Sequence, residues 1–469
     1  MEIMNDDKSD HIKQDHTQNI MKEIISSAKN QSNDIDGYTK NTDKDEYYEL
    51  VEAKNTVKYI KHLVEVAKPT IDQNSAKPKD YDKWTEEEQF KYIMDNVKTY
   101  MPSIPQSLLF FTSGTLYRGD CGRNSMDRPF WLDMEKFQRG QKFMLDHLTS
   151  IILANMLSLF QLFAFTDGLK PLIFSQQSHT PYLAFKRYLS TFCYIRSWIT
   201  GDPWTVGTRA YNDIQTVRRM HRAMRLKLCE HDNEEIDMLT KIPNPWCSDR
   251  EIILEDLSSC PYPTVENGCL HLLVKPKGLN QSDMAATQFA FMGLIVLYPK
   301  KFGVYASDED IAAFCHTWRG IGYLLGMEDE YNFCRGSQKE IKQRSRDFIK
   351  VWVKPYLRQV TPEWEHMLKC VMEGTSYYIN VFTFKMALLY VANLLDIDMP
   401  RIRSMLTYYE WLKLIIVQHF LIPYVFKIRF VRQYINNTFF KALDKANKYK
   451  SEKHMELKKR SQKVLAEGR

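Results

Sequence analysis

Residues 133–166 read DMEKFQRGQKFMLDHLTSIILANMLSLFQLFAFT, and this stretch decides the fold class. Its aromatic and aliphatic residues recur at helical spacing, as in Phe137, Phe143, Met144 and Ile151. The part from Leu148 onward carries no charged side chain, which is typical of a helix buried in a large core or in a membrane. The spacing therefore predicts a helix over residues 133–166.

The same helical spacing begins near Trp84 and continues on both sides of this stretch. Glycine and proline contribute only 18 residues each to a chain of 469, so chain breakers are few and an all-α fold is favoured over a turn-rich β design. Further helices are predicted over 84–98, 181–199, 207–230, 283–298, 307–325, 339–352, 362–396, 401–420 and 424–460, with an irregular link near 240–280.

Charge and composition divide the chain into three parts. Residues 1–80 are polar, and their first 60 hold 8 Lys and Arg against 13 Asp and Glu, so we expect a flexible or loosely helical acidic extension. Residues 81–426 form the predicted helical domain. Residues 427–469 hold 13 Lys and Arg against 4 Asp and Glu and are predicted to form a basic helical tail. Such a tail either is a solvated helix end or binds anionic lipid; no nucleic acid is expected as a partner.

Three apolar stretches raise the question of membrane attachment. Residues 148–166, 284–299 and 414–426 are uncharged, but they are shorter than a span of about 20 residues or contain polar side chains such as Asn155 and Gln161. Buried core helices are the simpler interpretation, and monotopic membrane attachment is the alternative.

The sequence lacks the common catalytic and metal-binding signatures. Nine cysteines occur without a CxxC pair, and HExxH, GxSxG and GxxxxGK[ST] motifs are missing. Residues 319–326 contain a GxGxxxG spacing, but residues 310–318 before them have helical rather than strand periodicity. We therefore expect these glycines to let helices pack closely.

The first residues and the cysteines indicate a compartment. Residues 1–7 are acidic and polar, where a cleavable signal peptide is basic and then apolar. Unpaired cysteines fit a reducing environment. We therefore expect an intracellular protein, in the cytoplasm or on the cytosolic face of the ER membrane, without a cleavable signal peptide.

Two predicted helices carry polar residues that can meet at one pocket. Arg187 and Thr191 are four residues apart, and Arg218 and His221 are three apart, so each pair lies on one face of its helix. A neutral imidazole among apolar residues can ligate haem iron, and arginines can neutralise its propionates. A satisfied structural histidine and a solvated arginine face are the simpler alternatives. His147, His179, His316 and His419 are expected to be structural, with a second ligand as the alternative.

A set of short motifs in a fixed order carries a family resemblance. The motifs are Arg187-x-x-x-Thr191, the run RRMHRAMR at 218–225, QFAF at 288–291, and Trp318-x-x-x-GYLLG ending at Gly326. Over roughly residues 110–425 the chain resembles the DUF2236 family. This family comprises the catalytic domain shared by the ER-bound oxygenases of the MpaB type and by the rubber oxygenases called latex clearing proteins.

The resemblance implies a fold, a cofactor and a chemistry. It implies a mostly helical domain with a globin-like core, a non-covalent haem b, and cleavage or oxidation of an unsaturated isoprenoid or lipid chain by dioxygen. His221 matches the family's iron ligand, and Arg187, Thr191 and Arg218 match its pocket residues. The rubber-cleaving branch has a lysine directly before the pocket threonine, whereas this chain has Ser190. The alternative is a non-catalytic helical protein of the same fold that is membrane-associated or binds haem.

Overall fold

The computed structural model describes residues 44–74, 77–100, 104–258, 276–379 and 382–468. Within these ranges the secondary structure is helical, apart from an isolated β-bridge between Arg118 and Asn280. The predicted all-α class is therefore confirmed.

The helices have the following bounds. The first half contains α2 (Lys44–Asp72), α3 (Glu86–Asp95), α4 (Val97–Tyr100), α5 (Leu109–Gly114), α6 (Met134–Asp146), α7 (Leu148–Leu162), α8 (Thr166–Phe174), α9 (Pro181–Thr200), α10 (Arg209–Cys229), α11 (Asn233–Leu239) and α12 (Arg250–Ser258). The second half contains α14 (Gln281–Leu297), α15 (Asp308–Leu324), α16 (Gln338–Phe348), α17 (Lys354–Leu357), α18 (Pro362–Ser376), α19 (Phe384–Leu394), α20 (Pro400–Ser404), α21 (Tyr408–Ile416), α22 (Arg429–Asn447) and α23 (Ser451–Gly468). Short 3-10 helices are η2 (Tyr81–Lys83), η3 (Gln106–Leu108), η4 (Pro299–Phe302) and η5 (Asp329–Tyr331), and η6 (Ile349–Val353) and η7 (Val417–Val425) are π-helices.

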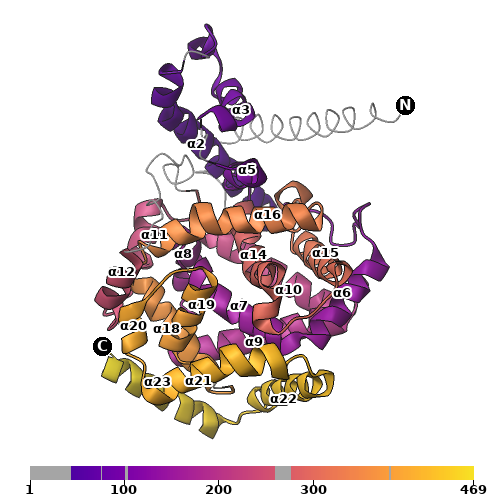
Figure 1. Ribbon diagram of the computed structural model, residues 1–469. Coiled ribbons are helices and arrows are strands. Elements are labelled where there is room, and N and C mark those ends of the chain that lie inside the picture. Colours follow the sequence, from indigo (N-terminus) through magenta and orange to yellow (C-terminus); the bar gives the residue numbers. More distant parts are fainter. Residues whose placement is uncertain (1–43, 75–76, 101–103, 259–275, 380–381, 469) are drawn as a thin grey trace.

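One large core fills the body of the protein. Figure 1 shows α7 and α14 in the interior, α16 across one side, and α21, α22 and α23 on the opposite side. The closest helix pairs are α6 with α15, α9 with α18, and α7 with α14. Most residues of α7 and α14 are buried, including Asn155 and Gln161, so both helices belong to the core.

The described N-terminal part is packed, unlike the flexible or loosely helical extension that the composition predicts. Residues 44–72 form the long helix α2, which with α3 builds a second, smaller core that includes Ile60, Leu63, Ile71 and Phe90. These apolar residues recur at helical spacing, and this signal outweighs the polar composition around it. Residues 44–72 are therefore helical, which is one of the two expected forms, and they are packed rather than loose. Residues 1–43 lie outside the described part of the chain.

The predicted continuous helix over 133–166 is interrupted at His147. The residue has φ −115° and ψ 23°, and α6 and α7 meet there at an angle of 86°. Asn436 of α22 satisfies the backbone at this break, because its Oδ1 accepts from Thr149 N (3.0 Å) and its Nδ2 donates to Leu145 O (2.9 Å). The partner that makes the break possible lies almost 300 residues away, so local periodicity gives no sign of it.

The C-terminal helices pack against the body. Phe439 and Leu443 of α22 and Leu457 and Leu465 of α23 belong to the large core. The Ser461 hydroxyl accepts a hydrogen bond from Tyr182 N at 3.2 Å. The predicted basic tail is therefore helical and docked rather than free.

Apolar helices in the described residues do not form a membrane span on their own. No individual helix there has both the length and the composition to cross a bilayer, whereas two sharply bent pairs meet these criteria by length and composition alone. The pairs are α6 with α7, and the segment Tyr408–Val425 with α22.

Glycines allow close packing around α15. A Cβ atom on Gly320 would meet Phe137 Cε2 at 2.8 Å, and one on Gly322 would meet Gln288 Nε2 at 2.6 Å. Both glycines lie within the helix itself, with no strand before them. The expectation that these glycines serve helix packing is confirmed for Gly320 and Gly322, whereas Gly326 follows the end of α15 with φ 96° and lies against Asp120.

The contact between α6 and α15 predicts a sensitive position at Gly140. A Cβ atom there would overlap Thr317 Oγ1 and the Ala313 carbonyl, both of which are buried in α15. We expect Gly140→Ala to lower the free energy of unfolding by about 2 kcal/mol, because the two helices must move apart. Denaturant unfolding followed by circular dichroism measures this. Gly168→Ala in α8 is the control, since its nearest neighbour lies at 3.6 Å; equal losses in both variants would contradict the packing argument.

Candidate functional site

A cavity of about 810 Å³ lies between α7, α8, α9, α10, α14 and α15. Its walls are mostly aliphatic and aromatic, with a few polar groups among them. Phe291 of α14 and Trp318 of α15 stack at a centroid distance of 4.7 Å and form part of the wall. The volume and the mixture of an apolar wall with a few polar side chains are those of a small-molecule site.

Helices α9 and α10 bring three of the four predicted site residues to this cavity. Each helix begins at a threonine cap: the Thr180 hydroxyl accepts from Leu183 N, and the Thr208 hydroxyl accepts from Tyr211 N. Arg187 and Thr191 line the cavity from α9, and His221 lines it from α10. His147, His179, His316 and His419 do not line it.

His221 is neutral at physiological pH. Burial and the nearby Arg187 charge lower the pKa of His221 to about 4, against a smaller opposing effect of Asp120. Its Nδ1 atom is buried and has no hydrogen-bond partner among the residues that the structure describes. A buried ring nitrogen without a partner is costly unless a ligand or an ordered water binds it, so this side chain is suited to ligand binding.

Arg187 places a positive charge at the cavity without a carboxylate beside it. Its Nη1 atom donates to the hydroxyls of Ser175 and Ser178, both at 3.2 Å, and it forms no ion pair with any described residue. Burial lowers the pKa of Arg187, but a guanidinium stays protonated at neutral pH. The cavity therefore holds a partly buried cation whose hydrogen-bond partners among the described residues are neutral hydroxyls, which favours a ligand with an anionic group.

The Thr191 hydroxyl is bonded within its own helix. It donates to the Arg187 carbonyl at 3.0 Å, one helical turn earlier. The oxygen keeps its acceptor capacity towards the cavity, so Thr191 can accept a hydrogen bond from a ligand while its own proton bonds to the helix.

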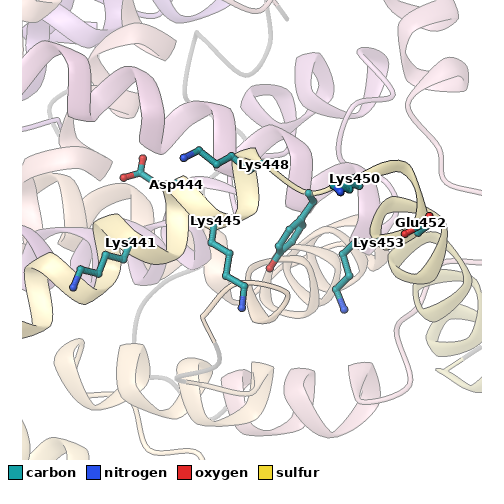
Figure 2. Close-up of a pocket in the computed structure, with 8 residues that line it drawn as sticks. Lys441, Asp444, Lys445, Lys448, Lys450, Glu452 and Lys453 are labelled. Atoms are coloured by element: carbon teal, nitrogen blue, oxygen red, sulfur yellow. The ribbon is translucent and has the colours of Figure 1, made fainter.

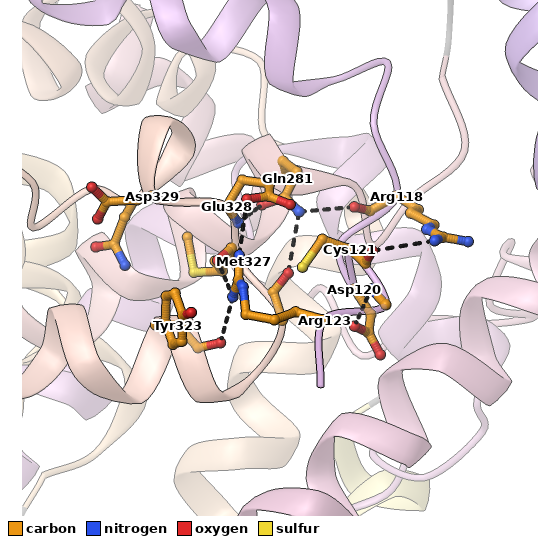
Figure 3. A network of polar contacts seen from close by, with 12 residues as sticks. Arg118, Asp120, Cys121, Arg123, Gln281, Tyr323, Met327, Glu328 and Asp329 are labelled. Atoms are coloured by element: carbon orange, nitrogen blue, oxygen red, sulfur yellow. Dashed lines mark hydrogen bonds and ion pairs between the residues drawn. The ribbon is translucent and has the colours of Figure 1, made fainter. Parts of the chain in front are cut away.

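Arg218 does not line the cavity. Its Nε and Nη2 atoms bind Asp120 Oδ1 at 3.0 and 2.6 Å, and Nη2 also donates to the Arg123 carbonyl at 2.8 Å. Asp120 and Arg123 belong to the polar network of Figure 3, in which Gln281 donates to the Arg118 carbonyl at 2.9 Å. Arg218 therefore fixes α10 to the segment that follows α5 and orients His221 from a distance.

Sequence reasoning missed Asp283, which also lines the cavity. It lies in the first turn of α14, where an acidic residue is ordinary, so its position gave no sign of a site. Its Oδ2 atom accepts from Leu279 N at 2.8 Å. Burial raises the pKa of Asp283 to about 6, with Asp167 adding to the rise, so the cavity contains a carboxyl group that titrates close to neutral pH.

Two indole groups add unsatisfied donors at the same cavity. The Nε1 atoms of Trp198 and Trp318 are buried without a hydrogen-bond partner, and both residues line the wall. Among the described residues, no group of three or more His, Cys, Asp or Glu side chains is arranged to hold a metal ion.

Comparison with family models, with curated proteins and with solved structures finds no match to this chain. The geometry of the site and the residue pattern described above are therefore the basis for a functional proposal.

The raised pKa of Asp283 predicts a pH-dependent stability. The folded state favours the protonated acid, so this contribution to stability is complete below a pH of about 4. It is lost as pH rises through about 6, at a cost of about 3 kcal/mol. Asp283→Asn removes the ionisation and can keep the bond from Leu279 N. We expect the difference in melting temperature between this variant and the unmodified protein to grow by a few degrees in favour of the variant as pH rises from 4 to 7.

Thermal unfolding at several pH values tests this expectation. Asp95→Asn, an exposed change on α3, is the control and should leave the pH dependence unchanged. A constant difference between Asp283→Asn and the unmodified protein over this pH range would show that Asp283 is ionised throughout.

Proposed function

We propose that the protein is a haem b-dependent oxygenase that oxidises or cleaves an unsaturated isoprenoid or lipid chain with dioxygen. The observation that carries the proposal is His221 at the wall of a largely apolar cavity, beside the partly buried cation of Arg187. His221 is a neutral imidazole with a ring nitrogen that has no partner among the described residues. A globin-like arrangement of the helices around the cofactor belongs to the same proposal.

The residues at the cavity fit a haem. His221 would bind the haem iron through a ring nitrogen, and its low pKa keeps the imidazole free of a competing proton. Arg187 would bind a propionate, since it has hydroxyl partners but no carboxylate among the described residues. Bound haem supplies the redox chemistry that a reaction of dioxygen with a carbon–carbon double bond requires.

The chain's own contribution is to bind, orient and keep out water. Aromatic and aliphatic walls, including Phe291 and Trp318, suit an apolar chain and exclude bulk water from it. The oxygen of Thr191 can accept a hydrogen bond beside the substrate. Arg218 acts through Asp120 by holding α10 in place, so we propose it as a positioning residue rather than as a residue that touches the ligand.

The substrate side of the proposal follows from the cavity and from the sequence. An intracellular prenyl or other unsaturated lipid is the proposed substrate and dioxygen the co-substrate, in the cytoplasm or at the cytosolic face of the ER. Incubation with such a lipid under oxygen should yield carbonyl products. A haem-loaded protein that is inert towards all prenyl lipids tested would count against catalysis.

One observation favours a non-catalytic alternative. A metal-binding histidine usually donates its second ring N–H to a carboxylate or carbonyl, whereas neither ring nitrogen of His221 forms a hydrogen bond with a described residue, and nearby Asp120 is bound to Arg218. A protein of the same fold that only carries haem or another anionic hydrophobic ligand satisfies Arg187 equally well. Haem uptake without oxygen-dependent turnover would identify the carrier.

The haem proposal predicts a spectroscopic result. Purified protein reconstituted with haem should show a Soret band, and His221→Ala should shift or abolish it by removing the ring nitrogen that binds the iron. Arg187→Met should weaken haem binding by about tenfold, the effect of one lost charge-assisted hydrogen bond. His231→Ala is the control, because His231 pairs with Glu235 near the surface and lies outside the cavity wall. If the intact protein takes up no haem, the oxygenase proposal fails.

A further inference from the structure

An unusual concentration of exposed apolar side chains lies on α21, η7 and the first half of α22. Of the 19 large apolar residues that are exposed in the described chain, 10 fall between residues 408 and 434. We call them the aromatic face, and most of them are tyrosine, tryptophan or phenylalanine. They are Tyr408, Tyr409, Trp411, Leu412, Ile416, Phe420, Tyr424, Ile428, Phe430 and Tyr434.

Two pairs of rings in the aromatic face contact each other. Tyr408 and Trp411 stack with centroids 5.9 Å apart, and Phe420 and Tyr424 lie 6.2 Å apart. The segment Tyr408–Val425 meets α22 at an angle of 120°, and Ile428 lies at this corner. Large apolar side chains that are exposed together on neighbouring elements mark interaction sites more often than singly scattered ones do.

Helix α22 joins this face to a cluster of lysines. Phe430, Tyr434, Lys441 and Lys445 fall within about 60° of one another around the helix axis. Lys441 and Lys445 are exposed, and with Lys448, Lys450 and Lys453 they surround the surface hollow in Figure 2. One stripe of α22 thus changes from aromatic to cationic along its length.

The net positive charge of this region favours an anionic partner. Residues 408–453 contain nine Lys and Arg against three Asp and Glu. Glu410 caps α21 through Thr407, and Asp444 is paired with Arg196 at 2.7 Å. Tyrosine and tryptophan favour the interface between water and lipid, and lysines near it are attracted to anionic headgroups. This combination of an aromatic centre and a lysine-rich border is more typical of a lipid-binding surface than of a protein-binding one.

We propose that α21, η7 and α22 dock the protein on an anionic lipid bilayer. The aromatic face enters the headgroup region, and Lys441, Lys445 and their neighbours contact the lipid phosphates and carboxylates. The site differs from a free basic tail, because Arg460 of α23 pairs with Glu373 and Lys458 lies over the Tyr182 ring. The proposal does not depend on haem binding.

Sedimentation of the full chain with lipid vesicles tests the proposal. We expect the protein to pellet with vesicles of phosphatidylcholine mixed with phosphatidylserine, to bind phosphatidylcholine alone more weakly, and to be released in part by salt. The combined variant Phe420→Ser, Phe430→Ser and Tyr434→Ser should weaken binding to both vesicles by at least about tenfold, because it removes apolar area that leaves water. Lys441→Glu with Lys445→Glu should weaken binding only to the anionic vesicles.

The matched control changes exposed apolar residues elsewhere. Phe130→Ser with Met238→Ser alters side chains that are 90% and 66% exposed and lie outside the aromatic face, so it should bind vesicles normally. Circular dichroism melting establishes that each variant is folded, and the lysine variant retains the whole apolar face. Failure of the full chain to pellet with anionic vesicles would overturn the proposal. So would a full chain that dimerises without lipid through the aromatic face and ignores vesicles.

Discussion

Two buried ion pairs hold α10, the helix on which the site depends. Arg218 binds Asp120 through its Nε and Nη2 atoms, and Arg225 binds Glu52 of α2 at 2.8 and 3.0 Å. His221 lies between the two arginines on the same side of the helix, since the three residues fall within about 60° around its axis. Breaking a buried pair by removing one partner typically costs about 3–5 kcal/mol, so both pairs fix the rotation and height of α10. The orientation of His221 towards the cavity follows from this constraint.

The sequence predicts the helices better than their ends and their partners. Apolar periodicity identifies α9, α10, α14 and α15 within a few residues, because each buries a broad face. It misses the corner at His147, where the backbone groups are satisfied by a side chain from α22. It also fails to predict that α2 is packed, because the apolar residues of α2 are surrounded by charged ones. Glu52 of α2 is buried because it pairs with Arg225. Long-range partners of this kind leave no local signal.

The same limit applies to the cavity. Helical spacing predicts that Arg187 and Thr191 share one helix face and that Arg218 and His221 share another. It does not predict which of these side chains reach the cavity. Arg218 binds Asp120, which lies nearly 100 residues earlier in the chain, and Arg187 therefore supplies the guanidinium that lines the cavity. Asp283 brings a carboxyl with a pKa of about 6, so the cavity is cationic when that acid is protonated and closer to neutral when it ionises. An anionic ligand is favoured most strongly by the protonated form.

Hydropathy treats three apolar stretches alike, and burial separates them. The helices α7 and α14 are apolar because they form the core and the cavity wall, and their polar residues Asn155 and Gln288 point to protein rather than to lipid. The stretch 414–426 has a similar composition, yet Ile416, Phe420 and Tyr424 are exposed. The fold accounts for the buried side chains, whereas the exposed aromatic ones beside lysines are the basis of the proposed lipid docking. An apolar helix is therefore informative about binding only when its exposed residues are known. In this protein α21 and η7 are the apolar elements with exposed aromatic residues.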